Sequence, residues 1–466
     1  MKQIISNIKY TFSANFITLL ISVIITLVLP RKLGVSDYGY YQLYLFYISY
    51  ASIFHFGLPD GIYLNIGGEY YENLDKIVLK KQLIVLFFGS ILMASLFFLG
   101  INFTESDRRF IYLVSIVCIF ITNIKVYLLF ILQATNRIRE YAKYTRMDRI
   151  LFFILCLTYI LFISNSFATV IILDLFSKLV SVLLLCYFMK DIVFLKVRIN
   201  LLDTIKKSIQ FISVGIKLML SYVAGLLIIG VIRFAIEAKW SINTFSKVSL
   251  VLSLSNMMMT FINAVSVVLF PILRRINSKN QRIIFFGLRN LLLPISFGLI
   301  IVFYPLQFFI QIWLPNYADS IFYLGILFPL FIYEGKVSLL SNTFLKTLRK
   351  EKTILKINIL SLILSVLLAA FSTMFNNVLL AILSILIVII FRSNFSEFSV
   401  SKYFNESTAI DIFIELFLTL IFVVFNIILP VGLSFLGYSL AYICYLFIKK
   451  SSIINAFKIL KSIEEI

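Results

Sequence analysis

Apolar runs of about 20 residues recur along the whole chain, and they constrain its fold more than any other feature. A helix of about 20 residues is long enough to cross a hydrocarbon core of about 30 Å. The chain is 61% hydrophobic and only 14% charged, whereas a soluble domain is nearer a quarter charged. A β-barrel would instead show short alternating segments. The pattern therefore predicts an all-α polytopic integral membrane protein.

Fourteen of these runs are predicted to span the membrane. We place them at 8–29, 38–58, 82–101, 110–132, 149–164, 167–188, 208–232, 245–272, 283–303, 318–345, 353–373, 376–396, 411–429 and 432–448. Residues 8–29 are too long for the core of a signal peptide and lack a small-residue cleavage site, so we expect a helix there. The connections on one side are all short, which predicts no soluble domain between the helices.

Basic residues cluster in every second loop of this arrangement. By our count about thirty of them lie on one side of the membrane and about six on the other. The positive-inside rule places the rich side, and both termini, in the cytoplasm. The net charge of +20 is then mainly a topology signal. Because it is scattered over short loops and not gathered on one folded face, no nucleic-acid partner is expected.

The longest inside connection, 189–207, divides the chain into parts. We expect an N-terminal lobe at 1–188, a C-terminal lobe at 208–403, and two additional helices with a cytoplasmic tail at 404–466. The mixed apolar and basic residues of 189–207 are typical of an interfacial helix on an anionic leaflet. A plain linker would have the same composition, so both interpretations stay open.

No pattern in the chain indicates catalysis, a cofactor or a metal. The cysteines all fall inside predicted spans, where they act as small apolar residues: Cys118, Cys156, Cys186 and Cys444. The single histidine, His55, is better explained as a packed side chain than as a proton relay. A P-loop, a metal-ligand spacing and a Ser/His/Asp arrangement are all missing from the sequence. We therefore expect neither an enzyme nor a metalloprotein.

Polar residues repeat at helical spacing in three spans. They are Thr11, Asn15, Thr18, Ser22 and Thr26 in the first, Gln210, Ser213, Lys217 and Ser221 in the seventh, and Ser249, Ser253, Asn256, Thr260 and Asn263 in the eighth. Such stripes either pack through interhelical hydrogen bonds or line water. Serine and threonine alone do not separate the two, but Lys217 favours a cavity.

Charged residues inside spans are informative because each costs roughly 2.5–3.5 kcal/mol to insert. The bases at this depth are Lys125, Lys178, Lys217, Lys247, Arg289 and Lys336, and the acids are Asp174 and Glu334. Asp174 and Lys178 are four residues apart on one helix face, which favours an internal ion pair. Glu334 and Lys336 are two apart and cannot neutralise each other. The excess of bases predicts a cationic interior, as a path for an anion requires.

Two stretches of the sequence resemble a known family. LPRKLGVSDYGYYQL followed by FGLPDGI, within 29–62, is similar to the second-helix region of Wzx-type bacterial polysaccharide flippases. These belong to the multidrug/oligosaccharidyl-lipid/polysaccharide (MOP) exporter superfamily. IQIWLPNYADS, LFPLFIY and SLLSNTFLKTLRKEK, within 310–352, also resemble that family.

The resemblance implies two six-helix lobes around a central cleft, lined by the first, second, seventh and eighth helices. It also implies that undecaprenyl-pyrophosphate-linked oligosaccharide crosses the bacterial cytoplasmic membrane by alternating access, for O-antigen (lipopolysaccharide) or capsule assembly. The polysaccharide polymerase and chain-length machinery are the implied partners. On this hypothesis the pyrophosphate binds Lys217, Lys125, Lys178 and Arg289, the sugars contact Asn15, Ser22, Asn256 and Asn263, and Asp174 or Glu334 couples a proton.

Three alternatives stay open to different degrees. A multidrug/cation antiporter of the same superfamily would need acids in its cleft, and the basic excess disfavours it. A polysaccharide polymerase or ligase would carry a large outer loop, which the sequence does not show. A peptidoglycan lipid-precursor flippase shares the implied fold and is the hardest to exclude.

Overall fold

A computed structural model of the chain describes residues 2–99, 105–198, 200–273 and 278–463. For 2–19, 94–99, 201, 258, 260–273, 278–279, 457 and 459–463 the description covers the backbone only. Every regular element in the described residues is helical, which confirms the all-α prediction. Within the described residues the predicted spans lie mostly on helices, although the span at 38–58 also crosses the turns at 49–50 and 56–57.

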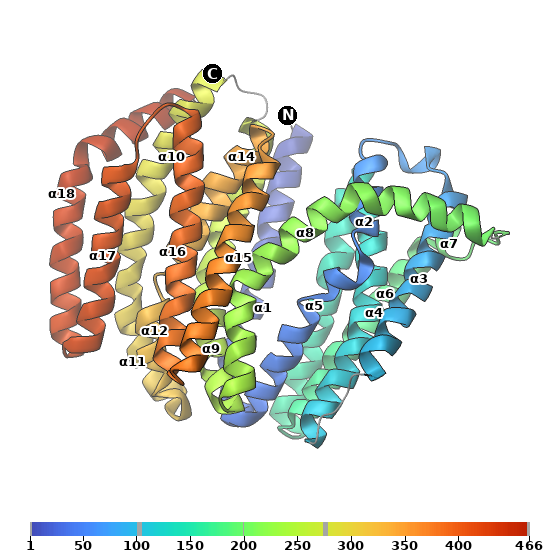
Figure 1. Cartoon of the computed structure of the whole chain (residues 1–466), viewed down its shortest axis with the longest axis horizontal. Helices are drawn as coiled ribbons and strands as arrows, with labels where there is room; N and C mark the ends of the chain where they lie inside the picture. Colours follow the sequence, from blue (N-terminus) through green and yellow to red (C-terminus); the bar gives the residue numbers. More distant parts are fainter. Residues whose placement is uncertain (1, 100–104, 199, 274–277, 464–466) are drawn as a thin grey trace. The chain divides into compact units, whose positions relative to one another are not determined.

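The first half of the chain forms eight α-helices and two short 3₁₀ turns (Figure 1). They are α1 (Lys2–Ile48), η1 (Ala51–His55), α2 (Leu58–Asn65), η2 (Tyr71–Asn73), α3 (Lys76–Leu99), α4 (Ser106–Ala134), α5 (Ile138–Phe162), α6 (Phe167–Phe188), α7 (Lys190–Val193) and α8 (Leu201–Lys239).

The second half is more broken, because one predicted span is built from several short helices. Its elements are α9 (Ile242–Leu273), α10 (Ser278–Leu299), η3 (Ile300–Val302), α11 (Phe303–Trp313), η4 (Pro315–Tyr317), α12 (Ser320–Leu327), α13 (Leu330–Gly335), the π-helical turn η5 (Lys336–Asn342), α14 (Thr343–Thr347), α15 (Glu351–Met374), α16 (Val378–Tyr403), α17 (Ala409–Ile428) and α18 (Val431–Ile463).

Nine helical segments of the described residues have both the length and the apolar composition of a membrane span. Two of them are the composite segments α10–α11 and α12–α14. The other seven are the single helices α4, α6, α8, α15, α16, α17 and α18. The other predicted spans lie on α1 and α2, α3, α5 and α9. The protein is therefore a multi-pass helical membrane protein.

The chain forms two compact units. We call residues 20–226 the N-terminal lobe, and 1–19 with 227–466 the C-terminal lobe. The N-terminal lobe packs α2, α3, α4 and the end of α6 around Tyr127 and Leu128, both fully buried. In the C-terminal lobe the rings of Phe285, Phe344 and Phe404 pack together at one core between α10, α14 and the end of α16.

The segment at 29–65 differs in detail from the prediction. α1 is interrupted at Gly34, whose φ of 80° is accessible to glycine without strain, so two helices meet there as expected. The glycines and the proline of FGLPDGI predict a break in the helix, and the structure has it at the start of this stretch: Phe56 and Gly57 are left-handed, and α2 begins at Leu58. Pro59 fits inside the first helical turn because the N–H that it lacks would have no helical partner there.

Candidate functional site

Helices α2 and α8 touch through their backbones in the N-terminal lobe. A Cβ atom placed on Gly215 of α8 would lie 2.0 Å from the carbonyl oxygen of Gly57 and 2.3 Å from the amide nitrogen of Gly61. One placed on Gly61 would lie 2.0 Å from the carbonyl oxygen of Phe211. Only glycine allows so close an approach. The glycines of the FGLPDGI stretch thus form a helix crossing with α8.

The start of α2 is held from within the same stretch. The backbone N–H of Gly57 donates to Nδ1 of His55 at 3.1 Å, so this ring nitrogen carries no proton. His55 is buried, and its Nδ1 lies 3.9 Å from the Asp60 carboxylate. The histidine therefore fixes the turn into α2, in agreement with its interpretation as a packed side chain.

Lys217 lies two residues beyond the crossing, on the opposite side of α8. With 3.6 residues per turn it points roughly 200° away from Gly215, and thus away from α2. Its side chain is exposed, and it forms no salt bridge with any residue that the structure describes. Gln210 and Ser213, on the same predicted stripe, are also exposed. Lys217 therefore presents an ammonium group that can bind an anion, from a helix whose backbone is held at the crossing.

The other predicted N-terminal cations have carboxylate partners. Nζ of Lys125 in α4 lies 2.8 Å from Oδ1 of Asp148 in α5, and both side chains are largely buried. Lys178 pairs with Asp174 one turn earlier on α6, which confirms the predicted ion pair. The hydroxyl of Tyr44 donates to the same Asp174 carboxylate at 2.6 Å. Asp174 thus contacts both Lys178 on its own helix and Tyr44 on α1.

Arg289 of α10 is 1% exposed and is surrounded by acids. Its Nε lies 2.5 Å from Glu397 of α16, its Nη2 2.5 Å from Glu415 of α17, and its Nη1 2.9 Å from Asp411 of α17. Each nitrogen of the guanidinium donates to a different carboxylate, a geometry that only the planar arginine fork provides.

The same acids bind two lysines. Lys336, in the π-helical turn, pairs with Glu397 and lies 2.8 Å from Glu415, and Lys449 of α18 pairs with Asp411. We call these residues the C-lobe charge network: Arg289, Lys336, Lys449, Glu397, Asp411 and Glu415. It holds three bases and three acids, and it joins α10, η5, α16, α17 and α18.

The predicted excess of buried bases is wrong for the part of the chain that the structure describes. Lys125, Lys178 and Arg289 have acid partners, and so do Lys247 with Asp319 and Lys336. The prediction missed these acids because Asp148 and Glu397 lie one residue outside the predicted spans, and Asp319, Asp411 and Glu415 lie near the starts of theirs. A spacing of four residues between Asp411 and Glu415 was the available signal.

Glu334 and Lys336 have separate partners, as their spacing predicted. Glu334 lies 3.4 Å from Nη1 of Arg392, whose Nε donates to the Asn358 side chain at 3.1 Å. Lys336 instead pairs with Glu415 of the C-lobe charge network. Both acids proposed for proton coupling, Asp174 and Glu334, are thus ion-paired in this conformation.

The predicted sugar-contacting residues are spread over two helices. Ser22 is half-buried and Asn256 is exposed, while the side chains of Asn15 and Asn263 lie outside the described residues. On the α9 stripe Ser249 accepts a hydrogen bond from Arg233 of α8 at 3.0 Å, and the hydroxyl of Ser253 donates to its own helix. For these two serines the packing interpretation holds.

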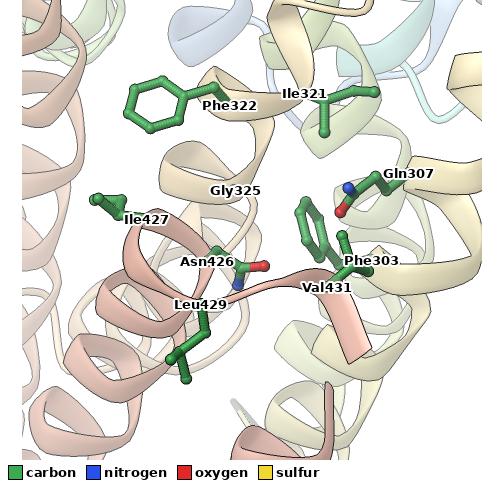
Figure 2. A pocket seen from close by; sticks show the side chains of 9 residues that line it. All are labelled: Phe303, Gln307, Ile321, Phe322, Gly325, Asn426, Ile427, Leu429 and Val431. Carbon is green, nitrogen blue, oxygen red and sulfur yellow. The ribbon is translucent and has the colours of Figure 1, made fainter. Parts of the chain in front are cut away.

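One small polar pocket lies in the C-terminal lobe, between α11, α12 and the α17–α18 connection. The side-chain amides of Gln307 and Asn426 turn toward its interior (Figure 2). Its volume of about 50 Å³ is enough for one or two water molecules and too small for a sugar. None of the predicted site residues lines it, so it is not the candidate substrate site.

The architecture is similar to that of solved membrane transporters, although the sequence matches no known family. No family model and no curated protein matches the sequence. Among solved structures, the lipid II flippase MurJ in an inward-closed conformation aligns over 97% of this chain and 100% of its own, with a TM-score of 0.69 at 14% identity. A MOP superfamily transporter from Pyrococcus furiosus aligns over 85% of this chain and 95% of its own, with a TM-score of 0.51 at 13% identity.

A MATE transporter in complex with MaL6 gives the same TM-score of 0.51 at 13% identity, over 82% of this chain and 91% of its own. Identities this low establish the fold alone. This fold agrees with the one that the sequence resemblance implies. The chain therefore has the fold of the MOP exporter superfamily, in which MurJ-like flippases and MATE transporters are its structural neighbours.

Proposed function

We propose that the protein is a flippase for undecaprenyl-pyrophosphate-linked oligosaccharides, which it moves from the inner to the outer leaflet of a bacterial cytoplasmic membrane. The product would feed O-antigen or capsule assembly. The main support for this proposal is Lys217. It is an exposed cation on a membrane-spanning helix, it forms no salt bridge with a described residue, and the glycine crossing holds its helix against α2. A pyrophosphate is a concentrated anion that an ammonium group can bind in place of water.

Within this proposal Lys217 makes the first contact with the pyrophosphate. Lys125, Lys178 and Arg289 each hold a carboxylate, so they could bind phosphate only after exchanging that partner. We therefore rank them behind Lys217. Asn15, Ser22, Asn256 and Asn263 remain the proposed sugar contacts, and the apolar tail would stay in the bilayer. The lobes would rock to give alternating access.

A second candidate, a peptidoglycan-precursor flippase, is favoured by one observation. The match to the lipid II flippase MurJ spans nearly the whole chain, and its TM-score exceeds those of the two transporters described above. Both candidates carry a lipid-linked pyrophosphate, so the cationic site suits either one. The sequence stretches at 29–62 and 310–352 favour the polysaccharide branch.

The test measures lipid-linked oligosaccharide in cells that depend on this protein, with protein levels matched. We expect Lys217→Ala to trap the oligosaccharide in the inner leaflet and to lower surface glycan at least tenfold. Lys217→Arg, which keeps the charge, should retain most activity. Lys356→Ala is the matched control, because Lys356 is also an exposed lysine of a predicted span, but in the other lobe.

Three outcomes decide the matter. Normal surface glycan in Lys217→Ala would refute the role of Lys217. Normal surface glycan after deletion of the whole gene, with peptidoglycan synthesis arrested instead, would favour the second candidate. Normal levels of both glycans after deletion, together with loss of resistance to cationic drugs, would favour an antiporter.

A further inference from the structure

The described residues of 190–209, which leave out residue 199, form an arm between α6 and the spanning part of α8. It comprises α7, a short connection and the first turns of α8, and Figure 1 shows the start of α8 crossing the end of the N-terminal lobe near α2 and α7. The sequence KDIVFLKVRINLLDTIKKSI holds five basic and two acidic residues. Apolar residues are interleaved with the basic ones.

The inner side of the arm is fixed to the lobe. Asp191 of α7 pairs with Lys76 of α3 at 2.8 Å and accepts a hydrogen bond from the Tyr71 hydroxyl at 2.9 Å. Burial raises the pKa of Asp191, but these two partners outweigh it and hold the pKa below its usual value. On α8 the hydroxyl of Ser208 donates to Oε1 of Gln82 at 2.6 Å. The arm therefore lies on the lobe in one defined orientation.

The outer side of the arm carries an apolar flank. Leu202, Ile205 and Ile209 are 81%, 48% and 59% exposed, and their spacing of three and four residues places them on one side of α8. Thr204 and Ser208, both buried, face the lobe from a different side of the helix. Large aliphatic side chains arranged in this way indicate contact with an apolar medium.

Basic residues border that flank. Lys206 lies roughly 100° around the helix from Ile205 and borders the flank, whereas Lys207 lies roughly 200° from Ile205, on another side of the helix. Both are exposed, and neither forms a salt bridge with a residue that the structure describes. Lys196 and Arg198, in the connection before α8, add charge at the same end. An apolar flank beside uncompensated lysines has the chemistry of a helix at the surface of an anionic bilayer.

We propose that the 190–209 arm is a binding surface for anionic phospholipid headgroups. Lys206, beside the flank, contacts the lipid phosphates, and Lys207 adds positive charge at the same level of the helix. Leu202, Ile205 and Ile209 enter the boundary between headgroups and acyl chains. The crossing at Gly215 holds α8 just beyond this surface, so the bound lipids set the depth at which the spanning part of the helix begins. This proposal does not depend on what the protein transports.

The test uses the full-length protein in nanodiscs and a tryptophan reporter on the arm. Trp240 and Trp313 are replaced by phenylalanine, and Ile205→Trp introduces the only tryptophan. Quenching is compared between brominated phosphatidylglycerol and brominated phosphatidylcholine at equal mole fraction. We expect about fivefold enrichment of phosphatidylglycerol at the reporter, the factor that corresponds to about 1 kcal/mol for one basic residue at a membrane surface.

Lys206→Gln combined with Lys207→Gln should abolish the preference while leaving quenching by phosphatidylcholine intact. The matched control is Lys352→Gln with Lys356→Gln, two exposed lysines of α15, which should leave the preference unchanged. Equal quenching by both lipids in the starting protein would overturn headgroup recognition. No quenching by either lipid would overturn the membrane contact. Displacement of phosphatidylglycerol by millimolar inorganic pyrophosphate would assign the surface to a soluble anion instead.

Discussion

Replacing Arg289 tests whether the C-lobe charge network stabilises the fold. Arg289→Met removes one base from a set of three bases and three acids and leaves one buried carboxylate without compensation. Glu397 and Glu415 are 0% and 1% exposed, so water cannot reach the charge that is left. Breaking a buried ion pair from one side costs about 3–5 kcal/mol. We expect the free energy of unfolding to fall by that amount.

Two further variants separate charge from geometry. Arg289→Lys keeps the charge but cannot bridge three carboxylates, so it should cost about 2–4 kcal/mol through lost charge-assisted hydrogen bonds. Arg289→Met combined with Glu415→Gln restores neutrality, so it should be more stable than the sum of the two single losses predicts. The measurement is the unfolding free energy of full-length protein, from titration with SDS in mixed micelles.

Arg282 provides the matched control on the same helix. It pairs with Glu406, but the two side chains are 50% and 36% exposed, and exposed ion pairs contribute only about 0–1 kcal/mol. Arg282→Met should therefore change stability little. If Arg289→Met and Arg282→Met cost the same, or if the neutral double variant is no better than additive, the network does not stabilise the protein as argued.

Two further predictions, one for Gly215 and one for Lys125, concern the N-terminal lobe. Gly215→Ala would place a Cβ 2.0 Å from the Gly57 carbonyl oxygen, so α8 must move away from α2, and overpacking of this kind costs about 1–3 kcal/mol in the same titration. Gly89→Ala, where the new Cβ meets nothing within 4 Å, should instead be neutral or stabilise by up to about 1 kcal/mol; equal effects of the two would contradict the crossing. Lys125→Met should destabilise by about 3–5 kcal/mol because Asp148 is left buried and unpaired, and adding Asp148→Asn should recover part of the loss. No recovery in that double variant would show that the pair is not coupled.

Local patterns in the sequence predicted the parts of this structure that depend on neighbouring residues. Apolar runs located the helices, because each backbone must satisfy its own hydrogen bonds in the bilayer. The Asp174–Lys178 pair was predictable because its members lie one turn apart. The partners of Lys125 and Arg289 were not, since they come from other helices and no spacing rule encodes that contact.

The glycine crossing is a second contact between distant parts of the chain that local sequence patterns do not predict. FGLPDGI carries conspicuous turn residues, which indicate a break in the helix but do not indicate a helix crossing. Gly215 is one of three glycines in α8, and nothing in the sequence distinguishes it as the contact point for Gly57 and Gly61. The position of Lys217 relative to α2 therefore became clear only from the structure.

The charge network also has a consequence for how the protein is made. The acids that bind Arg289 follow it by 108, 122 and 126 residues, so they do not yet exist when α10 leaves the ribosome. At synthesis rates of about 5–20 residues per second, the arginine waits roughly 5–25 s for its partners. During that time it must stay in the translocon, remain near the membrane surface or be held by another factor. The charge of Arg289 is thus fully neutralised only when α17 has been made.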